Sequence, residues 1–202
     1  MINVKPLRST GMGTDRLESL ADGIFAFAMT LLVMSINMPT VGQISNVAAF
    51  ISAQAGNFWN VIVIFFLLSL FWLNHSQQFH HIKKTTGVSI LLNLFILLLV
   101  IFMPFSTSLM NDYPTNTIAE VFFNLNIFIL SALLALNWWY SYWAGLLDPE
   151  GDKEHIAKVN HKILLPPALA LIAIVVAFFQ PGWSSLTYVT VPFFLFWPQR
   201  KA

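Results

Sequence analysis

The chain has 202 residues, of which 57% are hydrophobic, 15% aromatic and 9% charged. A soluble domain carries roughly 25% charged residues, so this composition leaves too little polar surface to face water, and it equally excludes a disordered chain. A net charge of +1 and the absence of cysteine argue against a nucleic-acid partner, a disulfide scaffold and a thiolate metal site. The sequence predicts an integral membrane protein.

Four long segments lack Asp, Glu, Lys and Arg, and they determine the number of membrane spans: residues 23–82, 85–111, 121–147 and 163–199. A helix needs about 20 mainly apolar residues to cross the hydrocarbon core, so the first segment holds two spans, separated by the polar stretch 39–57. The last segment breaks at Gln180-Pro181-Gly182, a turn signal. The prediction is therefore an all-α membrane protein of one domain, residues 1–202, with six helices near 18–38, 57–79, 88–110, 117–143, 161–179 and 183–198.

The ten Lys and Arg residues fix the expected orientation of these spans. Basic residues accumulate in cytoplasmic loops. In a six-span topology all ten lie on one side of the membrane: Lys5, Arg8, Arg16, Lys83, Lys84, Lys153, Lys158, Lys162, Arg200 and Lys201. We therefore expect both termini in the cytoplasm.

The first helix carries an apolar stripe. Phe27, Leu31 and Met34 fall at i, i+4 and i+7, with Thr30 beside them and small residues around them. Small residues let neighbouring helices approach closely. Periodicity alone leaves two readings open, ordinary helix packing or a face that lines a pore.

Polar side chains inside the first three spans form a second pattern. Asp22, His75 and Asn93 all lie near the cytoplasmic boundary, and Trp72 shares a helical face with His75. Buried ionisable groups in membranes usually face a protein interior, so a hydrogen-bonded cluster joining the three helices is one reading. The other is that Asp22 caps a helix and His75 lies at the membrane interface.

These residues resemble a known family. The first helix is similar to that of the transmembrane-protein-175 family, whose pattern is a basic residue, three variable positions, Phe-Ser-Asp, and Thr-Leu-Leu about two turns later. Arg16, Asp22 and Thr30-Leu31-Leu32 match this pattern, whereas Leu20-Ala21 replace Phe-Ser.

The resemblance continues into the next two helices. Phe71-Trp72-Leu73-Asn74-His75 looks like the Trp-x-x-His of the family's second helix. Asn93, followed by Pro104 and Thr107, is similar to its third-helix pattern. The last three helices resemble the family by length and hydropathy.

The resemblance implies a potassium channel rather than an enzyme, with no cofactor and with K⁺ as the permeating ion. It implies a homotetramer in the plasma membrane of a prokaryote, in which the first helix of each subunit lines the pore. Phe27 would form the narrowest ring, Leu31 and Met34 further apolar rings, and Thr30 a hydroxyl ring linked to selectivity. The polar residues would hold this helix in place: Arg16, Asp22, Trp72, His75 and Asn93.

Three other readings of the sequence compete with a channel. A proton-coupled or proton-conducting transporter would use Asp22 and His75 as a relay. A membrane enzyme would need more than His80-His81, which stand beside Lys83-Lys84 without a carboxylate at ligand spacing. A structural membrane protein without transport activity is the third reading, which the Leu20-Ala21 replacement leaves open.

Overall fold

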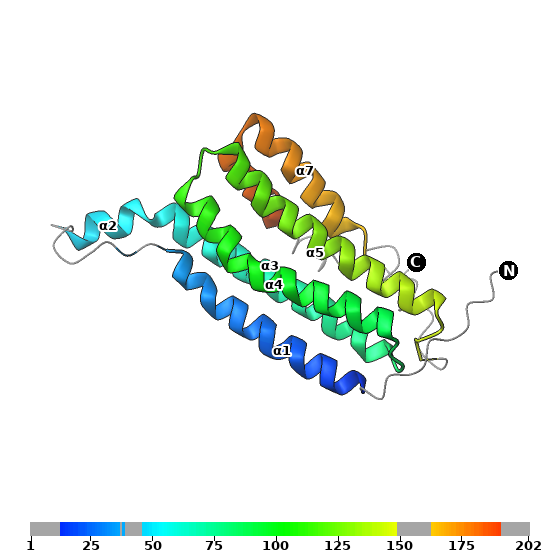
Figure 1. Cartoon of the computed structure of the whole chain (residues 1–202). Helices are drawn as coiled ribbons and strands as arrows, with labels where there is room; N and C mark the ends of the chain where they lie inside the picture. The colour runs from blue at the N-terminus through cyan, green and yellow to red at the C-terminus, as the bar shows by residue number, and fades with distance from the viewer. Residues whose placement is uncertain (1–12, 37, 39–45, 149–162, 191–202) are drawn as a thin grey trace, which may run out of the picture.

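The computed structural model describes residues 13–36, 38, 46–148 and 163–190. Every regular element within these ranges is a helix, and Figure 1 shows them arranged as an elongated bundle. The α-helices are α1 (Thr14–Leu31), α2 (Val47–Ala53), α3 (Ala55–His81), α4 (Gly87–Asp112), α5 (Thr117–Trp143) and α7 (Leu165–Phe179). Two 3-10 helices complete the set, η1 (Leu32–Ser35) at the end of α1 and η2 (Pro181–Thr190).

Four helices in the described part of the chain are long and apolar enough to cross a membrane. They are Thr14–Ser35, Ala55–His81, Gly87–Asp112 and Thr117–Trp143. The first four predicted helices are thus confirmed as helices of this kind, and the fourth has the predicted bounds.

The remaining two predicted helices differ from expectation. α7 has 15 residues, so it is about 22 Å long, against a hydrocarbon core of about 30 Å. The predicted sixth α-helix, over its described part, is instead the 3-10 helix η2, and residues 191–198 lie outside the described residues. Pro181 and Gly182 open η2, and Thr187, Val189 and Thr190 come after them, a composition that disfavours α-helix. η2 turns back along α7 at Gln180–Pro181, the break that the sequence predicts (Figure 1).

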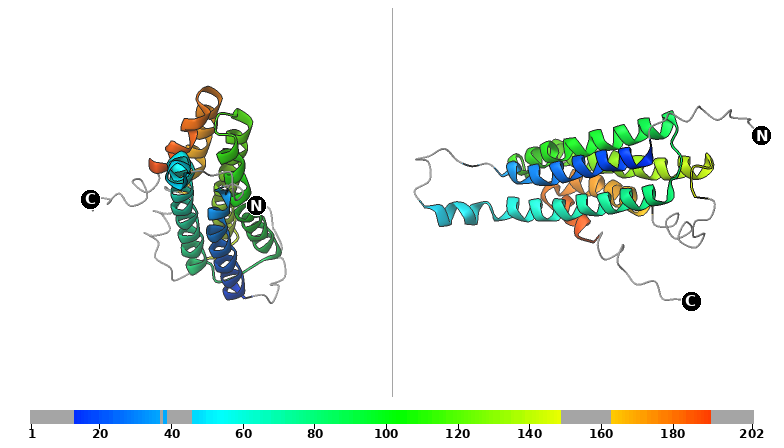
Figure 2. Two further views of the ribbon diagram at one scale, coloured as in Figure 1. Left: turned by 90° about the vertical axis from the view of Figure 1, so that its left-hand side faces the viewer. Right: turned by 90° about the horizontal axis from the view of Figure 1, so that it is seen from below.

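The helix α2 lies inside the stretch that the sequence assigns to a loop. The Asn46 side chain caps its start by accepting hydrogen bonds from the amides of Ala48 and Ala49, at 2.9 and 3.2 Å. Gln54 joins α2 to α3, and α2 and the start of α3 project beyond the rest of the bundle (Figures 1 and 2). None of the α2 residues is buried.

Two connecting segments meet at the opposite end of the bundle. Ile82 and Leu147 form an isolated antiparallel β-bridge, and the Lys83 amide donates to the Leu146 carbonyl at 2.9 Å. Thr86 caps α4 in a reciprocal arrangement with Ser89. The α3–α4 connection and the segment after α5, both predicted to be cytoplasmic, therefore share one end of the molecule.

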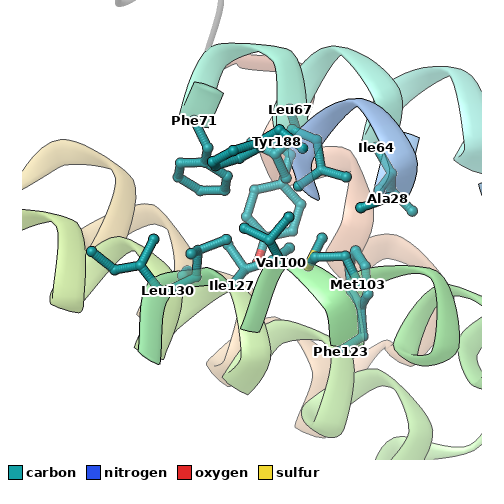
Figure 3. Close-up of a cluster of buried hydrophobic side chains, with 14 of the residues drawn as sticks. Ala28, Ile64, Leu67, Phe71, Val100, Met103, Phe123, Ile127, Leu130 and Tyr188 are labelled. Carbon is teal, nitrogen blue, oxygen red and sulfur yellow. The ribbon is translucent and has the colours of Figure 1, made fainter. Parts of the chain in front are cut away.

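The apolar core runs along α4, which packs against α1, α3 and α5, while α5 packs in turn against α7. In Figure 3, side chains of α3 face those of α4 and α5, with Tyr188 of η2 among them. The labelled residues are Ala28, Ile64, Leu67, Phe71, Val100, Met103, Phe123, Ile127, Leu130 and Tyr188.

A buried polar cluster holds η2 against α5. Ser184 Oγ donates to Glu120, the Asn124 amide donates to Ser184 Oγ at 3.0 Å, and the Tyr188 hydroxyl donates to Asn124 Oδ1 at 2.7 Å. Glu120 is 2% exposed and Ser184 fully buried. Ser184 is thus the central link of the cluster, because it bonds to both α5 side chains.

We predict that Ser184→Ala lowers the free energy of unfolding by about 1–3 kcal/mol, because it leaves a buried acceptor and a buried donor without their partner. Thermal unfolding in detergent measures the effect. Ser185→Ala is the matched control, since Ser185 makes no side-chain hydrogen bond to the described residues. Equal melting temperatures for the two variants would contradict the prediction.

Candidate functional site

The helix α1 has two distinct faces. Its buried residues recur every three or four positions and pack against α3 and α4: Leu17, Ala21, Phe25, Ala28 and Leu32. This spacing is that of a single helical face. α1 is therefore docked on the bundle along its whole length.

The opposite face of α1 is uncovered. Phe27 is 65% and Met34 73% exposed, and Thr30 is exposed between them, while Leu31 at the edge of the face is half-buried. Gly23 continues the same face, and a Cβ atom placed there would meet no atom within 4 Å. The stripe found by periodicity thus lies on a surface that the described residues leave open.

Side-chain hydrogen bonds join α1 to α3 at several points along their length. Ser76 Oγ donates to Glu18 at 3.2 Å, and the Trp72 indole donates to Asp22 at 2.8 Å. Further along, Ser69 Oγ contacts the Met29 sulfur at 3.4 Å. Residues 69, 72 and 76 share one face of α3, so these hydrogen bonds fix the side of α1 that is turned toward the bundle.

A second tie holds the far end of the first span, where α1 continues into η1. The Asn111 amide of α4 donates to the Ser35 carbonyl and hydroxyl oxygens, at 3.4 and 3.2 Å. Asn60 of α3 donates to Asn111 Oδ1 at 3.0 Å. Ser35 ends η1 and follows Met34 directly, so this tie fixes the position of the exposed Met34.

A second set of polar side chains is buried among α3, α4 and α5. We call it the inner polar cluster: His75, Gln78, Asn93 and Asn137. His75 Nε2 lies 2.9 Å from Asn93 Oδ1, and Asn93 donates to Asn137 Oδ1 at 3.4 Å. Asn137 donates to Gln78 Oε1 at 3.3 Å. The cluster therefore joins α3, α4 and α5.

The predicted polar residues fall into separate pairs. Asp22 bonds to Trp72, and His75 bonds to Asn93, but no hydrogen bond within the described residues connects the two pairs. The two bonds together join α1, α3 and α4 as two pairs. Arg16 is exposed in the first turn of α1, and its backbone amide donates to the Gly13 carbonyl at 3.2 Å.

Several residues of this site escape sequence reasoning. Glu18 lies one turn before Asp22, and Gln78 lies three positions after His75, so their spacing on each helix was an available signal. Asn137 is a fully buried amide of α5. Its partners on α3 and α4 could not be read from the sequence, because periodicity gives a face and not the neighbouring helix.

The two replaced motif positions lie on different faces of α1. Leu20 is 44% exposed, whereas Ala21 is fully buried in the core. A hydroxyl in place of the Ala21 methyl would need a buried partner. The replacement thus changes both the open face and the docked face.

The histidine pair at the end of α3 is a local feature. The His80 and His81 rings meet edge to face at 5.4 Å, and His81 contacts Trp138 at 6.2 Å. Within the described ranges no three or more His, Cys, Asp or Glu side chains come together as metal ligands would.

Comparison with known proteins agrees with this geometry. Residues 16–104 match the family described as the endosomal/lysosomal potassium channel TMEM175. A protein of Streptomyces collinus named a potassium channel is 27% identical over 68% of this chain and 69% of its own length. A protein of Chamaesiphon minutus, also named a potassium channel, is 27% identical over 86% of this chain and 88% of its own length. The human endosomal/lysosomal proton channel TMEM175 is 26% identical over 90% of this chain, which spans 40% of the human protein.

Solved structures share the fold. The crystal structure of a lysosomal potassium-selective channel TMEM175 homologue from Chamaesiphon minutus superposes with a TM-score of 0.79 at 23% identity, covering 90% of this chain and 96% of that one. The potassium channel MtTMEM175 superposes with a TM-score of 0.58 at 18% identity, covering 98% of this chain and 92% of that one. By the family match over its first three spans, this chain is similar to the TMEM175 family of ion channels.

Proposed function

We propose that the chain is one subunit of a potassium-preferring cation channel, in which four copies turn their α1 helices toward a central pore. The observation that carries this proposal is the two-faced α1, with one face tied to the bundle and the other open. An open apolar stripe with a single hydroxyl is the surface that a pore-lining helix would present. The bacterial relatives named potassium channels support the choice of ion.

The physics of such a pore can be derived from its side chains. Rings of Phe27, Leu31 and Met34 would form an apolar constriction, and a narrow apolar neck blocks ions by losing its water. Potassium holds its hydration shell less tightly than sodium, so the neck penalises sodium more. Phe27 is the bulkiest of the three and would form the narrowest ring.

Thr30 would supply the oxygen of the neck. Its Oγ1 donates to the Phe27 carbonyl at 2.7 Å, so its proton is committed to the backbone. The lone pairs of the hydroxyl oxygen then remain available on the exposed face. In a four-subunit pore, a ring of such oxygens would replace part of the hydration shell that K⁺ loses.

The polar residues would act as scaffold rather than touch ions. Asp22 and Trp72 hold the first half of α1 to α3, and His75 and Asn93 tie α3 to α4. Arg16, outside these pairs, would lie at the cytoplasmic entrance. Residues 1–202 would form one six-span domain in the lipid bilayer of a prokaryotic plasma membrane, with both termini cytoplasmic and residues 161–179 and 183–198 as the last two spans.

A second candidate function is proton conduction. Vertebrate relatives are named endosomal/lysosomal proton channels. Asp22 is an exposed carboxylate on the pore-side helix, about one turn from Phe27, and His75 lies buried behind α1. A proton relay through Asp22 and His75 would conduct without a potassium gradient.

Ion flux from liposomes that contain the purified protein tests both functions. Potassium, sodium and proton gradients are applied in parallel. Potassium-preferring flux without a coupling gradient supports the first proposal, and proton flux that Asp22→Asn abolishes supports the second. Absence of all flux contradicts both. In that case Leu20→Phe with Ala21→Ser, which restores the family motif, tests whether the replacement has abolished conduction.

We predict that Phe27→Ala raises cation flux several-fold and weakens the preference for K⁺, because the neck widens and stays wet. Phe178→Ala is the matched control, since Phe178 of α7 is also 65% exposed. Bi-ionic potassium and sodium flux measures the effect. Unchanged flux and selectivity in the Phe27 variant would remove this residue from the neck.

We predict that Thr30→Val reduces the preference for K⁺ over Na⁺, while Thr30→Ser retains it. Valine keeps the shape of threonine but lacks the oxygen, whereas serine keeps the oxygen and lacks the methyl. Permeability ratios of the two variants separate the hydroxyl from the packing. Equal ratios for valine and threonine would show that the hydroxyl contributes nothing to selectivity.

A further inference from the structure

The orientation of each side-chain amide in the inner polar cluster follows from a contact with a backbone carbonyl. The Leu134 carbonyl of α5 can accept but not donate, so Gln78 must turn its amide nitrogen toward it, at 3.2 Å. The Gln78 oxygen then faces Asn137, which must donate to it. The orientation of each amide in the cluster is thereby set by the one before it.

The same logic reaches the histidine ring. Asn137 turns its oxygen toward Asn93, whose nitrogen donates both to Asn137 and to the Ser89 carbonyl, the latter at 2.8 Å. The Asn93 oxygen is therefore the atom that faces His75, so the histidine must carry its proton on Nε2. A carbonyl of α5 thus fixes the orientation of a side chain on α3.

His75 passes this constraint to α1. Its ring stacks on Phe79 at 4.6 Å and contacts Phe25 of α1 at 5.9 Å. Phe25 is fully buried, and Phe27 lies two positions further along the same helix on the open face. A rotation of α1 that moves Phe27 must therefore move Phe25 across the His75 ring.

We propose that Asn137 and Gln78 are positioning residues for the pore-lining face of α1, acting through Asn93 and His75. α1 packs against α3 and α4, and both of these contact α5, so Asn137 acts across the layer of α3 and α4 that lies between α5 and α1 (Figure 1). Both amides are at most 1% exposed, and their hydrogen bonds stay within the bundle. The inference rests on the proposed channel function and extends its scaffold from three helices to four.

The test measures the position of α1 independently of ion flux. The chain has no cysteine, so Ala26→Cys places a single thiol on the exposed face beside Phe27. In this background, Asn137→Leu and Gln78→Met are made singly and together. The rate at which a cationic methanethiosulfonate reagent modifies the thiol is measured in proteoliposomes, alongside potassium and sodium flux.

We expect each single variant to change the modification rate and the potassium preference by at least about threefold. The double variant should change them no further, because both residues belong to one chain of bonds. Asn124→Leu is the matched control: Asn124 is an equally buried amide on α5, but it bonds to η2. The Asn124→Leu variant should be less stable than the parent, but its modification rate, ion flux and potassium preference should equal those of the parent.

The outcomes separate the inference from the proposed function. Unchanged modification rates in folded Asn137 and Gln78 variants, or equal changes in the Asn124 control, would overturn the inference whatever the flux. Additive effects in the double variant would overturn it too. If the variants change the modification rate but the parent protein shows no cation flux, the positioning role is upheld and the channel function is rejected. Should Asn137→Leu fail to fold, Asn137→Ser, whose hydroxyl is too short to hold both partners, replaces it.

Discussion

Inside a bilayer there is no water to satisfy a polar side chain, and this constraint governs the architecture of the whole bundle. Polar groups of the described spans meet across helix boundaries: Asp22 with Trp72, His75 with Asn93, Ser35 with Asn111, and Glu120 with Ser184. Apolar side chains fill the space between these pairs, but they set no direction, since lipid is as apolar as leucine. The polar pairs therefore decide which face of each helix turns inward.

The asymmetry of α1 is a consequence of that constraint. Its bonds to α3 and α4 all leave from one side, at Glu18, Asp22 and Ser35. The other side carries Phe27 and Met34, which the described part of the chain leaves exposed. Exposed apolar side chains are common against lipid, so the exposure of Phe27 alone would decide little. What sets α1 apart is that an exposed hydroxyl, Thr30, lies within the same stripe.

Sequence reasoning succeeded where one helix carries its own signal. The charge-free segments located four spans, because the length of an apolar helix depends on the bilayer and not on its neighbours. It failed where structure depends on a second segment. The β-bridge between Ile82 and Leu147 and the partners of Asn137 are long-range contacts that no periodicity encodes.

Two local features were also missed, for different reasons. The helix α2 had a readable start in the Asn46 cap, but it lies in the stretch 39–57, where Pro, Thr, Gly, Gln, Ser and Asn accumulate. The 3-10 geometry of η1 and η2 was not readable, because the composition of η2 disfavours an α-helix without specifying 3-10 geometry, and packing decides the form that each segment takes. For η2, the bonds of Ser184 and Tyr188 to α5 provide that packing.

The distribution of ties along α1 bears on how such a helix moves. Directional hydrogen bonds hold its two ends, whereas its middle is held by apolar packing and by the contact of Ser69 with the Met29 sulfur, a weak acceptor. Phe27 and Thr30 lie in this middle stretch. A 3-10 helix turns about 120° per residue and an α-helix about 100°, so each residue that changes between the two forms rotates the next part of the helix by about 20°. The junction of α1 with η1 at Leu32 lies between Thr30 and Met34, so a shift of this junction turns Phe27 and Thr30 relative to Met34 and Ser35.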